Sequence, residues 1–369
     1  MHFKDISDQV DWDETTGSIY AKTADDVKAA LAKDRRDLED FKALISPAAL
    51  PFLEEMAQLS NRLTLKRFGN TVQLFIPMYL SNVCENHCVY CGFNQDNKFK
   101  RTILTDEQIM QEVDVLKGYG YDHLLLVSGE SPRKVGVDYF KRVIEMLKPH
   151  FALISVEVQP LEQDEYETLI EAGLNSVYVY QETYNREKYK DYHIKGKKAD
   201  YHYRLDTPDR LGKAGIHKIG LGTLIGLEDW RTDAFFTAMH LKYLEKTYWR
   251  SKYCISFPRL RPHEGIFEPK FSISDPEFLQ LICAYRIFDE EAELSISVRE
   301  SPEFRDNLIK LGITTMSAGS KTDPGGYASD AHALEQFEVH DDRSPAEIEE
   351  MIRRQGYEPV WKDWDSCMQ

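Results

Sequence analysis

The stretch TVQLFIPMYLSNVCENHCVYC, residues 71–91, joins a β-rich apolar run to three closely spaced cysteines. The run is dominated by the aliphatic, aromatic and β-branched side chains that buried strands favour. Cys84, Cys88 and Cys91 follow directly after it. The stretch therefore predicts a strand whose C-terminal end leads into a metal-binding loop.

Seven further β-rich apolar runs follow, and amphipathic helical segments separate them. The eight runs cover residues 71–80, 123–129, 154–160, 176–183, 217–224, 253–260, 294–300 and 314–320. Alternating strands and helices indicate a parallel sheet, and eight strands fit a closed (β/α)8 barrel of the TIM type. An open doubly wound sheet is the alternative. In a barrel, chemistry belongs to the loops after the C-terminal ends of the strands.

Capping signals place several of the intervening helices. Thr105 and Gln108 make a capping box at the start of one helix. Gly173 and Gly215 follow helical runs at positions where a left-handed C-terminal cap is expected.

The segments outside the barrel break this alternation. The first seventy residues are helical in pattern, and Ser46-Pro47 predicts the start of a helix that Gly69 ends. Near the other end, residues 324–326 (Pro-Gly-Gly) indicate a loop, and Ser344 caps a final helix. We expect three parts: an N-terminal helical extension (1–70), a barrel (71–322) and a C-terminal extension (323–369).

Composition and charge exclude some classes of partner. The formal net charge of −16 argues against nucleic acids and anionic membrane surfaces. No apolar run approaches the roughly 20 residues of a transmembrane helix. The N-terminal sequence MHFKDISDQVDWDE has neither a secretory nor a transit-peptide pattern. We therefore expect a cytoplasmic protein.

The cysteine spacing C-x3-C-x2-C indicates an iron–sulfur cluster. Three thiolates on one loop can hold three irons of a [4Fe-4S] cubane and leave the fourth iron without a protein ligand. A structural zinc site is the alternative, but zinc usually takes two ligand pairs, and no second pair follows. Cys254 and Cys283 lie in apolar segments and are expected in the core, and Cys367 stands alone.

The cysteine motif, with Tyr90 before its last cysteine, is similar to that of the radical S-adenosylmethionine (SAM) superfamily. The resemblance implies that SAM binds the open iron through its amino and carboxylate groups. An electron from the reduced cluster then cleaves SAM to methionine and a 5′-deoxyadenosyl radical. The implied cofactors are a [4Fe-4S] cluster and SAM, with Tyr90 among the residues of their site.

The same resemblance assigns the remaining SAM-binding residues. Ser128-Gly129-Glu130, after the second strand, would bind the methionine ammonium group, and Glu182 would bind the ribose hydroxyls. Arg204 would bind the SAM carboxylate, and Gly222 lies in a segment that would approach the adenine. The alternatives are a solvated loop carboxylate for Glu182 and a surface helix residue for Arg204, and we favour the SAM-binding role for Arg204.

Longer stretches resemble the 2-iminoacetate synthase family over nearly the whole chain. They are residues 67–93, 123–130, 135–140, 157–161, 179–184, 193–198, 256–262, 297–306, 321–327 and 359–366. The resemblance implies a lyase that cleaves the Cα–Cβ bond of L-tyrosine to 2-iminoacetate (dehydroglycine) and p-cresol. SAM would be cleaved to methionine and 5′-deoxyadenosine, and the product would serve thiamine thiazole biosynthesis.

Two residues are predicted to bind the substrate carboxylate. Arg299, after the seventh strand, is the main candidate because a related tryptophan lyase uses a similarly placed arginine, although a structural ion pair is the alternative. Ser317, at the end of the eighth strand, is a second candidate. The phenol partner stays open among His263, Tyr178, Tyr180 and Arg259.

Two other functions remain as alternatives: a related lyase acting on tryptophan, and a non-catalytic zinc-binding scaffold. The tyrosine lyase of hydrogenase maturation carries a second C-terminal cysteine motif, whereas this chain has only Cys367 there. The implied partners are L-tyrosine, a thiazole synthase and an electron donor such as flavodoxin or ferredoxin.

Overall fold

Eight parallel strands form a closed barrel in the computed structural model, which describes residues 2–261, 267–329 and 335–362. They pair in the order β1-β3-β4-β5-β7-β8-β9-β10, and β10 pairs again with β1. Their bounds are β1 Thr71–Ser81, β3 His123–Ser128, β4 Leu153–Glu157, β5 Ser176–Tyr178, β7 Lys218–Gly222, β8 Lys252–Ser256, β9 Glu293–Ile296 and β10 Thr315–Ser317. The closure confirms the barrel and rejects the open sheet.

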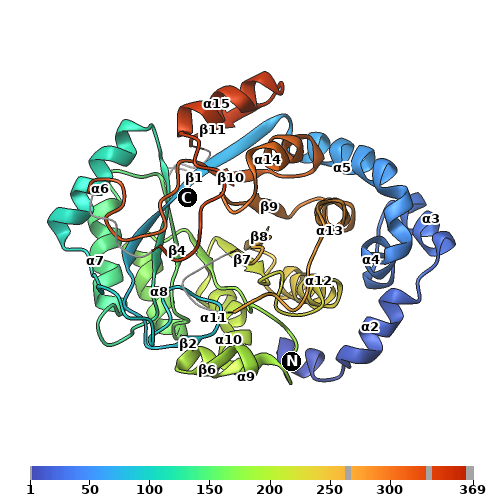
Figure 1. Cartoon of the computed structure of the whole chain (residues 1–369), viewed down its shortest axis with the longest axis horizontal. Helices are drawn as coiled ribbons and strands as arrows, with labels where there is room; N and C mark the ends of the chain where they lie inside the picture. The colour runs from blue at the N-terminus through green and yellow to red at the C-terminus, as the bar shows by residue number, and fades with distance from the viewer. Residues whose placement is uncertain (1, 262–266, 330–334, 363–369) are drawn as a thin grey trace.

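Helices follow the strands and surround the barrel (Figure 1). Thr105 and Gln108 form the expected capping box of α6, and Gly215 ends α11 in the left-handed conformation. Cys254 and Cys283 are fully buried in the core, as expected. The helices are α6 Asp106–Gly118, α7 Val137–Leu147, α8 Gln163–Ala172, α10 Tyr201–Leu205, α11 Thr207–Ala214, α12 Trp230–Thr247, α13 Asp275–Phe288 and α14 Pro302–Leu308, with a short 3₁₀ helix at Ile309–Leu311.

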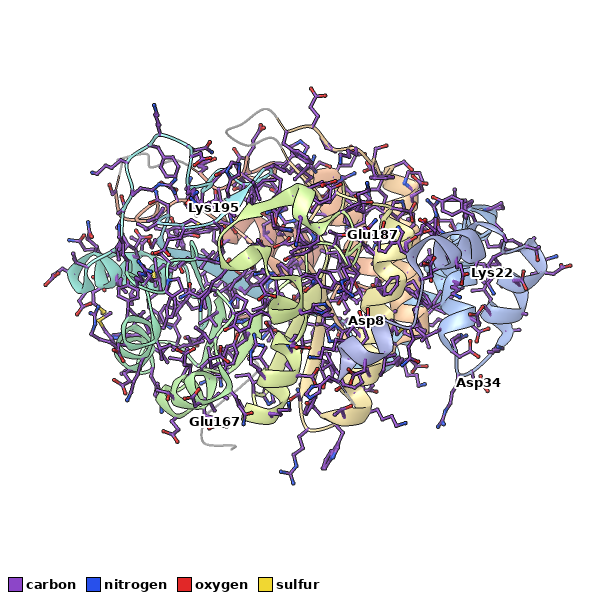
Figure 2. All side chains as sticks on the ribbon, turned by 90° about the horizontal axis from the view of Figure 1, so that it is seen from below. Asp8, Lys22, Asp34, Glu167, Glu187 and Lys195 are labelled. Atoms are coloured by element: carbon purple, nitrogen blue, oxygen red, sulfur yellow. The ribbon has the colours of Figure 1, made fainter. Side chains whose placement is uncertain are left out.

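The N-terminal helices make a second layer outside α12 and α13 (Figure 1). Arg231 of α12 donates to the carbonyl oxygen of Ile45 at 2.9 Å, and Gln280 of α13 donates to that of Leu44 at 2.8 Å. Figure 2 shows this layer from below, with Lys22 and Asp34 on it. Its members are α1 Phe3–Ser7, α2 Trp12–Tyr20, α3 Ala24–Ala32, α4 Leu38–Ile45 and α5 Leu53–Phe68.

The helix predicted from Pro47 begins differently. Residues Pro47–Phe52 form a 3₁₀ helix, and the α-helix α5 begins only at Leu53. Pro51 accounts for the difference because proline has no N–H to donate within an α-helix. The helix ends at Gly69, as predicted.

The C-terminal part returns to the barrel. Helix α15 (Pro345–Arg354) carries the predicted capping box between Ser344 and Glu347. It is followed by β11 (Glu358–Val360), which the sequence did not predict and which pairs in parallel with Thr71–Gln73 of β1. Since β3 pairs with β1 only from Ile76 onward, β11 covers the part of β1 that β3 leaves free.

A small antiparallel ribbon lies at the mouth of the barrel. It joins β2 (His87–Cys88), inside the cysteine motif, to β6 (His193–Lys195). Helix α9 (Tyr189–Tyr192) precedes β6, and a 3₁₀ helix (Lys197–Ala199) follows it. The ribbon fixes one cysteine to the chain that leaves β5. Each helix within the described residues is either too short or too polar to span a lipid bilayer.

Candidate active site

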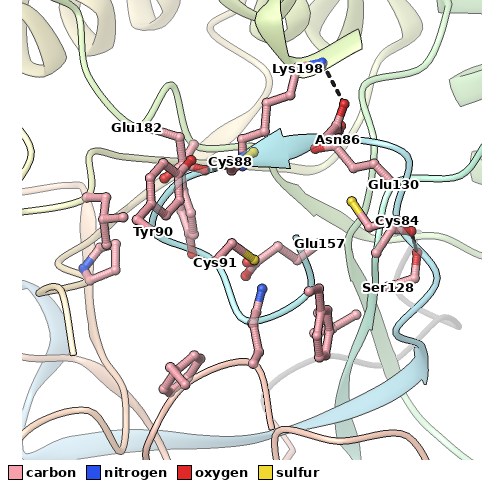
Figure 3. Close-up of a pocket in the computed structure, with 18 of the residues that line it drawn as sticks. Cys84, Asn86, Cys88, Tyr90, Cys91, Ser128, Glu130, Glu157, Glu182 and Lys198 are labelled. Carbon is pink, nitrogen blue, oxygen red and sulfur yellow. Dashed lines mark hydrogen bonds and ion pairs between the residues drawn. The ribbon is translucent and has the colours of Figure 1, made fainter. Parts of the chain in front are cut away.

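A cavity of about 950 Å³ opens at the C-terminal ends of the barrel strands (Figure 3). Its wall combines the cysteine motif with the segments that follow β3, β4, β5 and β9. It brings together the predicted residues Cys84, Cys88, Tyr90, Cys91, Ser128, Gly129, Glu130, Glu182, Arg204 and Arg299. Segments more than two hundred residues apart in sequence therefore build one site.

Gly222 is the predicted cofactor residue that this cavity does not include. It ends β7 but lines a separate small pocket between the barrel and helices α12 and α13. A Cβ atom at Gly222 would lie 2.7 Å from the carbonyl oxygen of Ser256, so close packing against β8 requires glycine here. Its role toward the adenine stays a prediction.

Backbone hydrogen bonds hold the cysteine loop, residues 82–95, in place. Glu85 donates its N–H to the carbonyl oxygen of Glu130 at 2.9 Å, and Val89 donates to that of Tyr192 at 3.1 Å. The Tyr90 hydroxyl lies 2.8 Å from Nε2 of His193, fixing the aromatic ring before the last cysteine. The loop is thus tied both to the Ser-Gly-Glu segment and to the ribbon.

The three thiols fit a cubane cluster. Burial, reinforced by Glu130, raises the pKa of Cys84 to about 11, and burial also raises the pKa of Cys88 and Cys91. Among the described lining residues there is no histidine and no fourth cysteine, and no three described His, Cys, Asp or Glu side chains are gathered around one ion. Because each thiolate of a cubane binds a different iron, three cysteines in one cavity without a fourth cysteine or a histidine among its described lining residues suit a [4Fe-4S] cluster with one open iron.

A network of charged side chains lies beside the thiols in the wall of the cavity. Arg204 donates to Glu130 at 2.9 Å and to the carbonyl oxygen of Tyr180 at 2.6 Å, and one of its amino groups lies 3.5 Å from Glu182. Lys198 donates to Glu182 at 2.7 Å. Burial alone would raise the pKa of Glu130, but Arg204 and Lys198 outweigh it and hold that pKa below its ordinary value.

Lys198 and Asn86 belong to this network but were not predicted from the sequence. Lys198 stands in a run of three lysines, Lys195 to Lys198, which reads as a solvated surface segment. Asn86 lies between two of the cysteines and donates to Glu130 at 2.7 Å. The ribbon folds residues 193–198 back over the cysteine loop and brings Lys198 to the site, where its backbone N–H donates to Oδ1 of Asn86 at 3.1 Å.

Two backbone features shape this wall. Glu182 has φ of 70°, and it is the only non-glycine residue with positive φ in the described chain. Such a conformation costs on the order of 1–3 kcal/mol and is common at functional sites. Gly129 permits the close approach of β3 to the cysteine loop, because a Cβ atom there would lie 2.5 Å from the carbonyl oxygen of Val83.

A second cavity, of about 650 Å³, adjoins the first and lies deeper in the barrel. The first is called the upper cavity and the second the deeper cavity. Both share Glu157, Tyr180, Arg299 and Phe337 in their walls. Ser317 lines the deeper one, and its hydroxyl is buried with no hydrogen-bond partner among the described residues.

Arg299 stands at the junction of the two cavities. Its guanidinium lies 3.4 Å from the centre of the Phe337 ring. Within the described chain it makes no side-chain hydrogen bond or ion pair, so it is available to a ligand. The neighbouring Arg259, by contrast, is paired with Glu300 and Asp275.

The other candidates for binding the phenol hydroxyl lie in different parts of the structure. Tyr178 lines the upper cavity and Tyr180 lines both, whereas His263 lies outside the described residues. Glu157 and Gln336 were not among the predicted site residues, and Gln336 accepts a hydrogen bond from Tyr79 at 2.7 Å. Glu157 is hidden inside a strand pattern, and Gln336 belongs to a loop without a motif.

Comparison with known proteins agrees with this geometry. Residues 78–237 match the Radical SAM superfamily, and residues 256–358 match the Biotin and Thiamin Synthesis associated domain. The chain is 50% identical over 367 residues to 2-iminoacetate synthase of Escherichia coli (strain K12), which covers 99% of this chain and 97% of that protein. The relative from Salmonella typhimurium (strain LT2) gives the same identity and coverage.

Two solved structures have the same architecture. The crystal structure of HydG, a maturase of the [FeFe]-hydrogenase, superposes with a TM-score of 0.89 at 32% identity and covers 95% of this chain and 79% of that one. Methylornithine synthase (PylB) superposes with a TM-score of 0.74 over 91% of this chain and 97% of that one, and at 19% identity it shows the fold alone.

The closed barrel with a cysteine triplet at its mouth defines a radical SAM enzyme. The 50% sequence identity to two 2-iminoacetate synthases, over 99% of this chain, allows a narrower assignment. The chain belongs to the 2-iminoacetate synthase family.

Proposed function

We propose that this enzyme cleaves the Cα–Cβ bond of L-tyrosine to 2-iminoacetate and p-cresol, for the thiazole ring of thiamine. The observation that carries the proposal is the 50% identity over 99% of the chain to a curated 2-iminoacetate synthase. The two joined cavities support it, because they offer a cofactor site and a separate space for an amino acid.

The upper cavity supplies the cofactor site. Cys84, Cys88 and Cys91 would hold a [4Fe-4S] cluster, which together with bound SAM supplies a radical able to remove a hydrogen atom from the substrate. The wall of the upper cavity offers both positive and negative charges to the polar groups of SAM, through Glu130, Arg204, Glu182 and Lys198. Ser128, Gly129 and Tyr90 line the same cavity.

The deeper cavity supplies the substrate site. Arg299 presents a planar fork of N–H donors that suits bidentate binding of a carboxylate, and Ser317 adds an unused hydroxyl on the same wall. Phe75, Leu125 and Phe257 make the rest of the cavity suitable for an aromatic ring. Holding the amino acid rigidly in a closed space brings the reacting atoms together and excludes water.

The partners follow from this chemistry. A radical SAM enzyme needs a reductant, and we propose flavodoxin or ferredoxin for this role. Because 2-iminoacetate is a reactive imine, we also propose direct transfer to a thiazole synthase. The cytoplasmic location and the borders of the three chain segments stay predictions.

Product analysis with tyrosine and tryptophan in parallel tests the proposal. Anaerobically reconstituted protein, supplied with SAM and a reductant, should form p-cresol and 5′-deoxyadenosine with tyrosine and no cleaved product with tryptophan. Metal analysis should give about four irons and four sulfides per chain. Product from tryptophan alone would favour the tryptophan lyase, and one bound zinc without SAM cleavage would favour the scaffold.

A further inference from the structure

Two opposite charges face the same space without touching each other. Glu157 ends β4, Arg299 follows β9, and both side chains line the upper and the deeper cavity. Within the described chain, neither side chain forms a hydrogen bond or an ion pair, either with the other or with a third residue. Figure 3 shows Glu157 projecting into the open space that Cys84 and Cys91 border.

Glu157 is exceptional among the carboxylates of this site. Glu130 is paired with Arg204, and Glu182 with Lys198. Glu157 has no such partner, and burial together with the nearby charge of Glu182 raises its pKa to about 7. The carboxylate is half-buried and faces the cavities without a partner. A partly desolvated charge without a partner is costly, which favours a cationic ligand for it.

We infer that Glu157 binds the α-ammonium group of the amino-acid substrate while Arg299 binds its α-carboxylate. A zwitterionic head group carries both charges on neighbouring atoms, so it can bridge two opposite side chains that do not reach each other. The inference rests on the proposed function for the identity of the substrate. Its recognition chemistry applies to any α-amino acid.

The assignment fixes the orientation of the substrate. With its head group at the junction between Glu157 and Arg299, the side chain of the amino acid points into the deeper cavity, toward Phe75 and Leu125. The amino nitrogen then lies beside the upper cavity, where the cofactors would bind. Glu157 is a positioning residue for this nitrogen.

The test compares ligands with and without an amino group. Binding of L-tyrosine and of 3-(4-hydroxyphenyl)propionate is measured on the reconstituted enzyme with SAM, for the wild type, Glu157→Gln and Glu157→Asp. Glu157→Gln should weaken tyrosine binding tenfold or more and leave the propionate unchanged, because only tyrosine has the ammonium group. Glu157→Asp, which keeps the charge, should show a smaller loss for tyrosine. Glu171→Gln, on the exposed side of α8, is the matched control and should change neither affinity.

Three results would overturn the inference. They are equal tyrosine affinity in Glu157→Gln and the wild type, an equal loss for both ligands, and a loss of SAM affinity in place of tyrosine affinity. If wild-type enzyme forms no p-cresol but binds tyrosine in a Glu157-dependent way, the proposed reaction fails and the ammonium site stands. If p-cresol forms and the selective loss is absent, the ammonium site fails and the reaction stands.

Discussion

The Arg299 guanidinium lines the deeper cavity and forms no side-chain hydrogen bond or ion pair with any described residue. We predict that Arg299→Lys lowers kcat/KM for tyrosine about tenfold or more, because lysine keeps the charge but loses the fork of parallel donors. SAM affinity should not change. Steady-state kinetics with tyrosine, with the exposed Arg133→Lys as control, measures the effect, and an unchanged kcat/KM would remove Arg299 from the substrate site.

Two buried histidines make stability depend on pH. Burial lowers the pKa of His123 and of His240 to about 3, whereas an unfolded histidine titrates near 6.5. As the pH falls from about 6.5 toward 3, these two imidazoles bind protons in the unfolded chain but stay neutral in the folded chain. Each of these histidines should therefore lower the free energy of unfolding by about 1.4 kcal/mol per pH unit.

Urea unfolding of the metal-free protein between pH 7.5 and 5.5 measures this slope. In the variant His123→Gln, the free energy of unfolding should fall less steeply as the pH is lowered below 6.5, because one of the two histidines no longer contributes about 1.4 kcal/mol per pH unit. The same slope in the variant and the wild type would show that His123 is not held neutral in the fold.

At the scale of elements, the approach of β3 to the cysteine loop depends on one missing side chain. Gly129→Ala would place a methyl group 2.5 Å from the carbonyl oxygen of Val83, so the loop must shift. We predict a loss of SAM affinity of about tenfold or more, since such a shift moves Glu130 and the cysteines apart.

Gly118→Ala in helix α6 is the matched control. Nothing lies within 4 Å of its Cβ position, so alanine should stabilise the helix by up to about 1 kcal/mol and leave SAM affinity unchanged. Equal SAM affinity in Gly129→Ala and the wild type would contradict the close approach.

The elements that the sequence predicted are those with strong local patterns. All eight barrel strands and the cysteine loop followed from apolar runs, capping residues and spacing. Strands β2, β6 and β11 have two or three residues each, and pairing with distant segments creates them, so no local pattern predicts them. For the same reason Lys198 was not predicted, because the pairing of β6 with β2 brings it to the site. Glu157 was not predicted because its role depends on the cavity that forms when the barrel closes.

At the scale of the whole molecule, the buried carboxylate of Asp341 ties the C-terminal segment to the barrel, because it pairs with Arg305 and also with Arg343. Arg305 of α14 contacts the Asp341 carboxylate and the carbonyl oxygen of Ser317, and Arg305 and Asp341 are both fully buried. Asp341→Ala should lower the free energy of unfolding by about 3–5 kcal/mol, because it leaves a buried guanidinium without its charge partner.

The double variant Arg305→Met/Asp341→Leu should recover much of this loss, since Arg343 keeps its pair with Asp306 and no unpaired charge remains in the core. Glu349→Ala breaks the exposed pair with Arg353 and should cost less than about 1 kcal/mol. Chemical denaturation of the three variants compares these values, and a loss in Asp341→Ala no larger than in Glu349→Ala would show that the tie carries little stability.

An iron left open by Cys84, Cys88 and Cys91 is the feature on which the proposed activity depends. Electron paramagnetic resonance of the reduced cluster, recorded before and after addition of SAM, tests it most directly. We predict a changed spectrum in the wild-type protein and no cluster signal in Cys88→Ala, whose circular dichroism should remain that of a folded barrel. A wild-type spectrum that SAM leaves unchanged would mean that the fourth iron is already occupied, and this would contradict the radical SAM site.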